Sequence, residues 1–162
     1  MTLGASAYFV LKYLHVLGAI VLFGTGVGIA FFMLAAHRSG DAAHVARTAS
    51  TVVLADWLFT ATAIVVQPIT GYFLLRQTGG ALSESWVVAS LALYIVAGAA
   101  WLPVVWLQMR MRDLAAACAS SGELLSAAYH RLFRAWFVLG FPGFASVAGI
   151  LWLMIAKPRL WG

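Results

Sequence analysis

Charged residues are scarce in this sequence. Of its 162 residues only 9% are Asp, Glu, Lys or Arg, whereas 64% are hydrophobic. A typical soluble domain has about 25% charged and roughly 45–50% apolar residues, so these few charges cannot cover a water-soluble surface. The composition excludes a soluble single-domain enzyme and an intrinsically disordered chain. It predicts a small protein that crosses a lipid bilayer several times.

Cysteine is nearly absent as well. The single cysteine, Cys118, cannot form a disulfide bond within the chain, which excludes a disulfide-stabilised scaffold. The net charge is +5, but the basic residues are scattered and form no continuous stripe, so we expect no nucleic-acid partner. In a membrane protein such charges indicate orientation and contact with lipid head groups.

Four long apolar segments separated by charged residues make up most of the chain. A transmembrane helix needs about 20 apolar residues, and short connections make consecutive helices antiparallel. We therefore predict an all-α membrane protein, a four-transmembrane-helix bundle with up-down-up-down topology, as a single domain over residues 1–162. The longest connection covers residues 112–129, where an alanine-rich run favours an extension of the third helix. The predicted spans are about 8–36, 53–75, 85–109 and 133–156.

The two sides of the predicted bundle differ slightly in positive charge. The side of the first and third loops carries Arg38, Arg47, Arg110, Arg112, Arg131 and Arg134. The side of both termini and the second loop carries Lys12, Arg76, Lys157 and Arg159. Because positively charged loops favour the cytoplasm, we expect the termini outside and loops one and three in the cytoplasm.

Tryptophans are expected near the two interfaces, with Trp86, Trp152 and Trp161 on one side and Trp57, Trp106 and Trp136 on the other.

Polar side chains inside a span are costly and often mark a functional site. At a rise of 1.5 Å per residue, His15 lies roughly a third of the way across the bilayer. The residues expected at a similar depth on the other helices are Gln67, Tyr94, Thr70 and Ser146. Two interpretations remain open: a hydrogen-bonded cluster between helices, or a metal or haem ligand with polar partners around it.

Small residues follow His15 on its own face of the first helix. Gly18 and Gly26 leave a flat groove there, and a macrocycle needs such a groove to reach an axial imidazole. The same helix contains Gly24 and Gly28 at GxxxG spacing, which ordinarily serves close helix packing. The pattern is compatible with both uses.

A second group of ionisable residues lies at the opposite end of the spans. We expect Asp56 to form an ion pair with Arg134 or Arg131, which would hold the second helix against the fourth. His37 and His130 are candidates for a second metal or haem site.

Other chemistry has less support in the sequence. Met109 and Met111, with Cys118 nearby, are soft ligands of the kind that Cu(I) prefers, but residues two apart do not face each other on a helix. No Ser-His-Asp, paired-carboxylate or HExxH arrangement is visible.

Three prolines interrupt the later helices, and prolines in membrane helices free carbonyls and bend a helix around a cavity. They are Pro68, Pro103 and Pro142.

Several motifs carry a resemblance to a known family. They are the stretch LKYLHVLG at residues 11–18, FGTG at 23–26, AHR at 36–38, DW at 56–57 and QPITG at 67–71. With these motifs, over most of its length, the chain resembles the bacterial integral-membrane family named domain of unknown function 2269. That resemblance implies a multi-pass protein of the bacterial inner (cell) membrane and no particular activity.

A more distant resemblance connects the start of the chain to the CopD/HemJ-like four-helix membrane proteins. CopD-like proteins are associated with copper handling. HemJ-like proteins contain haem b and oxidise protoporphyrinogen, and their first-helix histidine, which matches His15, is a haem ligand. They also use a lysine on a later helix, and this chain has no lysine between Lys12 and Lys157.

The resulting hypothesis is a membrane protein that binds haem b, or a related redox cofactor, through His15. Gly18 would line the cofactor, and Gln67 and Tyr94 would surround it. The process would be electron transfer or tetrapyrrole or quinone oxidoreduction, so the chain would be a membrane oxidoreductase if it is an enzyme. A quinone or redox partner and a homodimer are compatible with this hypothesis. The alternatives are a copper or small-solute transport component and a ligand-free structural or assembly subunit.

Overall fold

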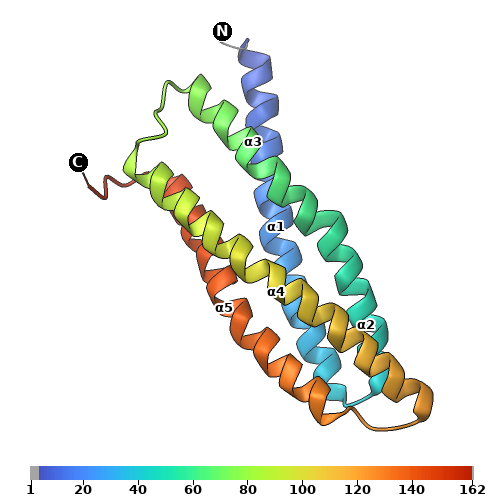
Figure 1. The fold of residues 1–162 in the computed structure, drawn as a ribbon. Helices are drawn as coiled ribbons and strands as arrows, with labels where there is room; N and C mark the ends of the chain where they lie inside the picture. Colours follow the sequence, from blue (N-terminus) through green and yellow to red (C-terminus); the bar gives the residue numbers. More distant parts are fainter. Residues whose placement is uncertain (1–3, 162) are drawn as a thin grey trace.

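The computed structural model describes residues 4–161, so residues 1–3 and 162 of the predicted domain lie outside it. The helices are α1 (Ala5–Ser39), α2 (Ala42–Ala55), the π-helical turn η1 (Asp56–Thr60), α3 (Ala61–Gln77), α4 (Ser85–Ser121) and α5 (Ala127–Ala156) (Figure 1). The described residues include no β-strand. Because α2, η1 and α3 form one continuous helix, four helices within the described residues are long and apolar enough to cross a membrane. The predicted all-α, four-helix fold is confirmed.

The helices extend well beyond the predicted spans at the end that holds the first and third loops. Asp41 begins α2 because its side chain accepts a hydrogen bond from the Ala43 N–H, so residues 42–52 are helical rather than part of a connection. The third helix continues to Ser121, as the alanine-rich run indicates. Gly40 and Gly122 end α1 and α4 at positive φ values of 69° and 73°, which glycine adopts without strain.

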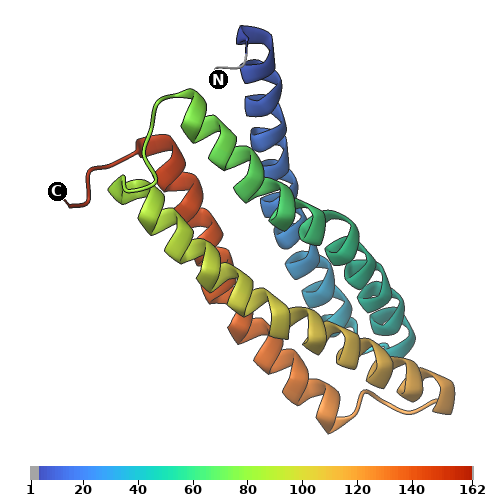
Figure 2. The same cartoon turned by 45° about the horizontal axis from the view of Figure 1, so that its top comes forward.

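The bundle consists of two helix pairs that separate toward one end. Helix α1 packs along α3, and α4 packs along α5, while α2 contacts α4. The views in Figures 1 and 2 show the two termini and the α3–α4 turn at one end, with the α1–α2 and α4–α5 loops at the other. We call these the terminal end and the loop end. The pairs lie close together at the loop end and diverge toward the terminal end.

The hydrophobic core lies at the loop end. Its fully buried side chains include Met33, Val45, Met111 and Tyr129, which come from α1, α2, α4 and α5. This core joins all four long helices, and dense packing of this kind gains dispersion energy even in lipid. The loop end is therefore the firmly packed half of the molecule.

At the terminal end, the chain after α5 is tied to the beginning of α4. The Ser85 hydroxyl donates to the Pro158 carbonyl oxygen over 3.4 Å. Next to it, Glu84 accepts hydrogen bonds from the Ala81 N–H at 2.9 Å and the Trp86 indole at 2.6 Å. These two bonds hold the pKa of the Glu84 carboxyl below its usual range. The Ser85 bonds thus hold the chain after α5 against the beginning of α4 at this end.

Replacement of Met111 by alanine tests where the core lies. Met111 is fully buried, and removal of a buried methionine side chain costs about 2–5 kcal/mol because it leaves a cavity. Met109, two residues earlier, is only partly buried and provides the matched control. We expect M111A to lower the unfolding temperature in detergent, followed by circular dichroism, much more than M109A does. Equal losses in both variants would contradict this position of the core.

Candidate functional site

His15 takes part in a polar contact between α1 and α3. The Gln67 side-chain amide donates to the His15 carbonyl oxygen at 2.8 Å, and His15 Nδ1 lies 2.8 Å from the Thr70 hydroxyl. That hydroxyl is also 2.8 Å from the Val66 carbonyl oxygen, which can only accept. Its single hydrogen therefore goes to the carbonyl, and the hydroxyl accepts from His15 Nδ1–H. Neutral His15 then has its lone pair on Nε2.

Two glycines allow this close approach. A Cβ atom on Gly18 would collide with the Gln67 amide, and one on Gly71 would lie 3.2 Å from His15 Cε1. Small residues serve close helix packing in membranes in this way. The groove expected beside His15 is not open at Gly18, because Gln67 fills it. The QPITG motif thus contains three residues that dock α3 onto α1.

Tyr94 and Ser146 have partners other than this contact. The Tyr94 hydroxyl donates to the Ile64 carbonyl oxygen on α3 at 2.5 Å. That carbonyl lacks a helical donor because Pro68, four residues later, has no N–H. Ser146 donates to the Pro142 carbonyl on its own helix at 2.7 Å. Of the residues expected at one depth, the structure therefore brings together His15, Gln67 and Thr70, whereas Tyr94 links α4 to α3.

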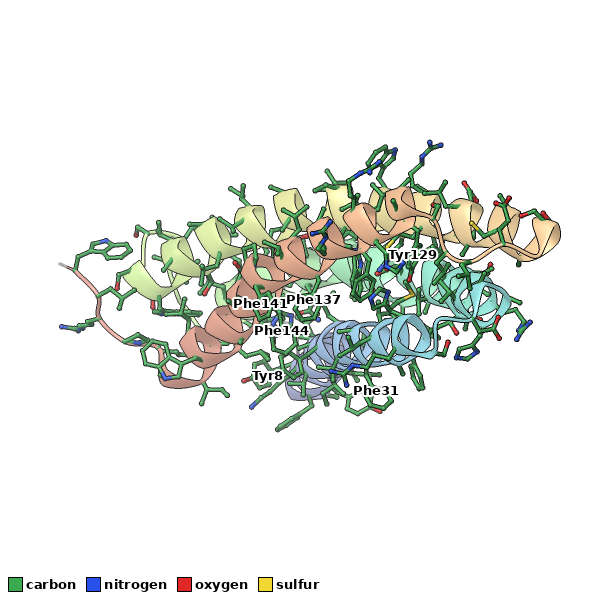
Figure 3. The ribbon with its side chains drawn as sticks, turned by 90° about the horizontal axis from the view of Figure 1, so that it is seen from below. Tyr8, Phe31, Tyr129, Phe137, Phe141 and Phe144 are labelled. Atoms are coloured by element: carbon green, nitrogen blue, oxygen red, sulfur yellow. The ribbon has the colours of Figure 1, made fainter. Side chains whose placement is uncertain are left out.

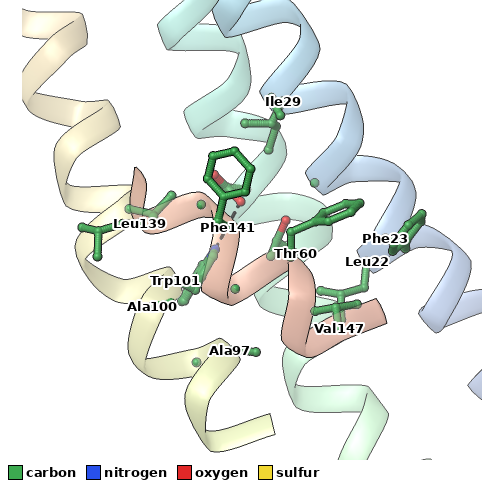
Figure 4. Close-up of a pocket in the computed structure, with 18 of the residues that line it drawn as sticks. Leu22, Phe23, Ile29, Thr60, Ala97, Ala100, Trp101, Leu139, Phe141 and Val147 are labelled. Carbon is green, nitrogen blue, oxygen red and sulfur yellow. Dashed lines mark hydrogen bonds between the residues drawn. The ribbon is translucent and has the colours of Figure 1, made fainter. Parts of the chain in front are cut away.

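A cavity of about 410 Å³ lies between the two helix pairs (Figure 4). Its walls come from α1, η1, α3, α4 and α5 and are largely apolar, with several aromatic rings. Tyr94 lines it toward the terminal end, and Gln108 lines it near the packed core. His15 is not among the lining residues. Both the volume and the apolar character fall in the range of small-molecule sites, about 300–1,000 Å³.

The cavity opens toward the surrounding lipid between α1 and α5. Val27 on α1 and Phe137 and Phe141 on α5 line the cavity and are also exposed on the outside. Figure 3 shows Phe137, Phe141 and Phe144 on the side of α5 that faces α1. The ring centroids of Phe144 on α5 and Phe23 on α1 lie 4.9 Å apart. A molecule dissolved in the bilayer could therefore reach the cavity without crossing water.

The polar end of the cavity begins at the π-helical turn η1. Here the Ala61 N–H bonds to the Asp56 carbonyl, five residues earlier. Asp56 and Thr60 are buried on the inner face, while residues 57–59 are exposed. The Trp101 indole N–H donates to Oδ1 of the Asp56 carboxyl group at 3.2 Å, the dashed line in Figure 4. Such π-helical turns occur frequently at functional sites.

The predicted ion pair between Asp56 and Arg134 is wrong. Within residues 4–161 the one ion pair joins Arg112 and Asp113 at 2.8 Å, and both Arg131 and Arg134 are exposed. The physical reason is position: η1 turns Asp56 into the cavity, whereas the two arginines lie on the outer face of α5, where a guanidinium keeps its solvation. Asp56 is thus a buried carboxyl group without a basic partner in the described chain.

Four buried polar atoms of cavity-lining residues lack hydrogen-bond partners in the described part of the structure. They are Thr60 Oγ1, Gln108 Nε2, Gln108 Oε1 and Trp136 Nε1. Thr60 and Gln108 lie beside the Asp56 carboxyl group, but not in hydrogen-bonding geometry. Thr60, Gln108 and Trp136, which carry these atoms, all line the cavity. Since each unpaired buried group costs about 1–3 kcal/mol, the polar end of the cavity calls for a further partner.

Sequence reasoning missed most of this polar cluster, which consists of Asp56, Thr60, Trp101, Gln108 and Trp136. It identified Asp56 but assigned the wrong partner. Gln108 lies inside the predicted third span, so the criterion that selected Gln67 would also have selected it. Trp136 was expected at a membrane interface, but it is buried. Nothing in its local sequence distinguishes it from an interfacial tryptophan.

His37 at the loop end has protein partners. His37 Nδ1 lies 3.3 Å from the Tyr129 hydroxyl, and the His37 ring stacks on Phe133 with centroids 3.6 Å apart. The His37 and His130 rings have centroids 5.5 Å apart, and His130 is exposed. No group of three or more His, Cys, Asp or Glu residues in the described part could hold a metal ion. The second site at His37 and His130 stays a prediction, with no third ligand among these residues.

A Gly18→Ala substitution tests the docking of α3 onto α1. Because the new methyl group displaces the Gln67 amide, it removes the hydrogen bond to His15 and costs about 1 kcal/mol relative to a control. Gly24→Ala is that control, since a Cβ there meets nothing within 4 Å. Thermal unfolding of both variants, alone and combined with Gln67→Ala, forms a double-mutant cycle. We expect Gln67→Ala to have little further effect in the Gly18→Ala background; full additivity would contradict the contact.

Comparison with known proteins agrees with the membrane architecture. The family model described as "Predicted integral membrane protein (DUF2269)" matches residues 9–158. No curated protein and no solved structure matches the chain, so the similarity to the CopD/HemJ-like proteins stays a prediction. Four apolar helices and this match together identify an integral membrane protein with four spans. The chain belongs to the DUF2269 family of integral membrane proteins.

Proposed function

We propose that this protein binds a small, largely apolar molecule from the lipid phase in the cavity between its two helix pairs. The ligand's polar group would lie against Asp56, Thr60 and Gln108. The observation that carries this proposal is the set of unpaired, buried polar atoms at one end of an otherwise apolar cavity. A membrane interior offers no bulk water to satisfy such atoms.

The shape and chemistry of the cavity support this function. Its opening lies between α1 and α5, where the wall residues are exposed to lipid. The apolar walls suit a hydrocarbon or aromatic body, and Gln108 supplies both donors and an acceptor for a polar group. Such a site belongs to a carrier, sensor or transport component for a small solute. We further propose the bacterial inner membrane as its location, with both termini outside.

Filling the cavity tests this function. Gly98 lines the cavity, and a Cβ there meets nothing within 4 Å, so Gly98→Leu adds a side chain to open space. Gly24 has equally open surroundings but does not line the cavity, and Gly24→Leu is the matched control. Mass spectrometry of extracts from protein purified in lipid nanodiscs should find a retained small molecule in the wild type and in G24L. We expect G98L to lose it.

Two outcomes of this mass-spectrometry experiment would contradict the proposed function. If wild type, G24L and G98L retain the same lipids and no additional molecule, the cavity does not bind a lipid-phase ligand. If a molecule is retained and G98L keeps it at the same level as G24L, that result would equally contradict the site.

A redox cofactor on His15 is the second candidate function. One observation favours it: the hydrogen bond to Thr70 directs the imidazole lone pair to Nε2, and metal-binding histidines commonly have their other ring nitrogen bonded in this way. The filled position at Gly18 argues against a macrocycle on that part of the α1 face. The cavity therefore remains the first candidate.

Absorption spectroscopy tests the second candidate directly. If His15 holds haem b, a dithionite-reduced minus oxidised spectrum of the purified protein shows b-type Soret and α bands, and His15→Ala abolishes them. Thr70→Val serves as the companion variant, since it removes only the hydrogen bond to Nδ1 and should shift the bands or weaken haem retention. A colourless wild-type protein from haem-replete cells would rule this candidate out.

A further inference from the structure

The described residues that line the cavity include an acidic side chain but no basic one. Asp56 is the cavity's one acidic residue, with 3% of its surface exposed, and no lysine, arginine or histidine is among the described residues that line the cavity. The remaining titratable group in the lining is Tyr94 on α4, whose hydroxyl is bonded to the Ile64 carbonyl. Helices α1 and α5 contribute no titratable side chain to the lining. A charge that develops on Asp56 therefore has no partner in these walls.

A buried carboxylate without a counter-charge is unstable in apolar surroundings. It costs several kcal/mol to hold the charged form there. The indole hydrogen bond from Trp101 and the neighbouring Thr60 and Gln108 side chains offset only part of this cost. Without a cation beside it, the carboxyl group is therefore best kept neutral, with its proton. A cation that enters the cavity favours the charged form of Asp56, because it supplies the missing counter-charge.

The walls next to Asp56 also suit a cation. Trp101 donates to Asp56, and Trp136 and Phe137 line the same cavity. The faces of aromatic rings attract cations, most strongly when water is excluded. A bare metal ion fits less well, because hard cations such as Ca²⁺ take 6–8 oxygen ligands and only Asp56, Thr60 and Gln108 offer side-chain oxygens at this end. The volume and apolar walls favour an organic cation.

We infer that the cavity binds a lipophilic organic cation and that Asp56 releases its proton when the cation binds. This inference rests on the proposed function and names its ligand class. The exchange is balanced: the neutral carboxyl group and the free cation become a carboxylate–cation pair and one released proton. No bond to the ligand forms and no electron is transferred. The Gln108 amide and the Thr60 hydroxyl, which lie beside Asp56, then donate to the carboxylate. This gives partners to polar atoms that have none in the described part of the structure.

Two ions of matching size and opposite charge test the inference on the wild-type protein. Tetraphenylphosphonium and tetraphenylborate are the probes, with calorimetric binding measured on the full chain in nanodiscs and empty nanodiscs as the reference. We expect the phosphonium to bind, with an affinity that rises by up to about tenfold per pH unit while Asp56 is protonated, and with proton release into weak buffer. The borate should bind at least tenfold more weakly. Equal binding of both ions, or binding of the phosphonium without pH dependence, would overturn the inference.

Variants at the acid provide the second arm. Asp56→Asn should weaken phosphonium binding and abolish its pH dependence, while Asp56→Glu should retain the dependence. Asp113→Asn is the control, because Asp113 is an exposed acid outside the cavity, and it should bind like the wild type. Helix content and gel-filtration profile show that each variant folds. Unchanged pH-dependent binding in D56N would refute a role for this carboxyl group.

The cavity-filling variant separates this inference from the proposed function. If both ions bind equally and Gly98→Leu abolishes both, the cavity binds lipid-phase molecules but does not select cations, and only the inference fails. If the phosphonium binds with Asp56-dependent pH sensitivity and Gly98→Leu leaves that binding unchanged, the ion lies outside the cavity and the proposed function fails. Loss of phosphonium binding in both G98L and D56N supports both.

Discussion

Two polar contacts made by α3 determine where the helix pairs join and where they separate. On one side, Gln67 and Thr70 dock α3 onto α1 at His15. On the other, the carbonyl freed by Pro68 accepts the Tyr94 hydroxyl from α4. The Tyr94 contact bounds the cavity toward the terminal end, and the packed core bounds it toward the loop end. Since lipid offers no competing hydrogen bonds, these few contacts suffice to hold open a space that side chains do not fill.

Asp56 gives this space its chemistry. The same residue placed on the outer face of its helix would be near the interface, where arginines and water could neutralise it. The π-helical turn instead directs it inward, together with Thr60. The firmly packed end of the bundle, around Met111 and Tyr129, keeps Gln108 close to this carboxyl group. A rigid half thus positions a polar cluster at the edge of a looser, apolar half, an arrangement that suits binding sites supported by a stable scaffold.

Much of the fold follows from the sequence, and less of the site does. The apolar segments between charges, such as the one that ends at Arg76, define four spanning helices because helix length and bilayer thickness are linked. Co-localisation of His15, Gln67 and Thr70 also follows from counting residues along straight helices. The partner of Asp56 could not be predicted, because an extra residue in a π-helical turn rotates every later side chain relative to an ideal helix. Nor does the sequence reveal that Gln67 occupies the face at Gly18, which is a matter of helix docking.

The most direct measurement concerns the side-chain amide of Gln108, the fully buried group with two unpaired atoms. In isotope-labelled protein in nanodiscs, filtered nuclear Overhauser spectra record which unlabelled protons lie near this amide. A cavity that binds a lipid-phase molecule predicts contacts from the Gln108 amide to protons of a bound molecule that is neither water nor bulk lipid. Contacts to water alone would contradict it, because they would show that solvent satisfies the polar cluster.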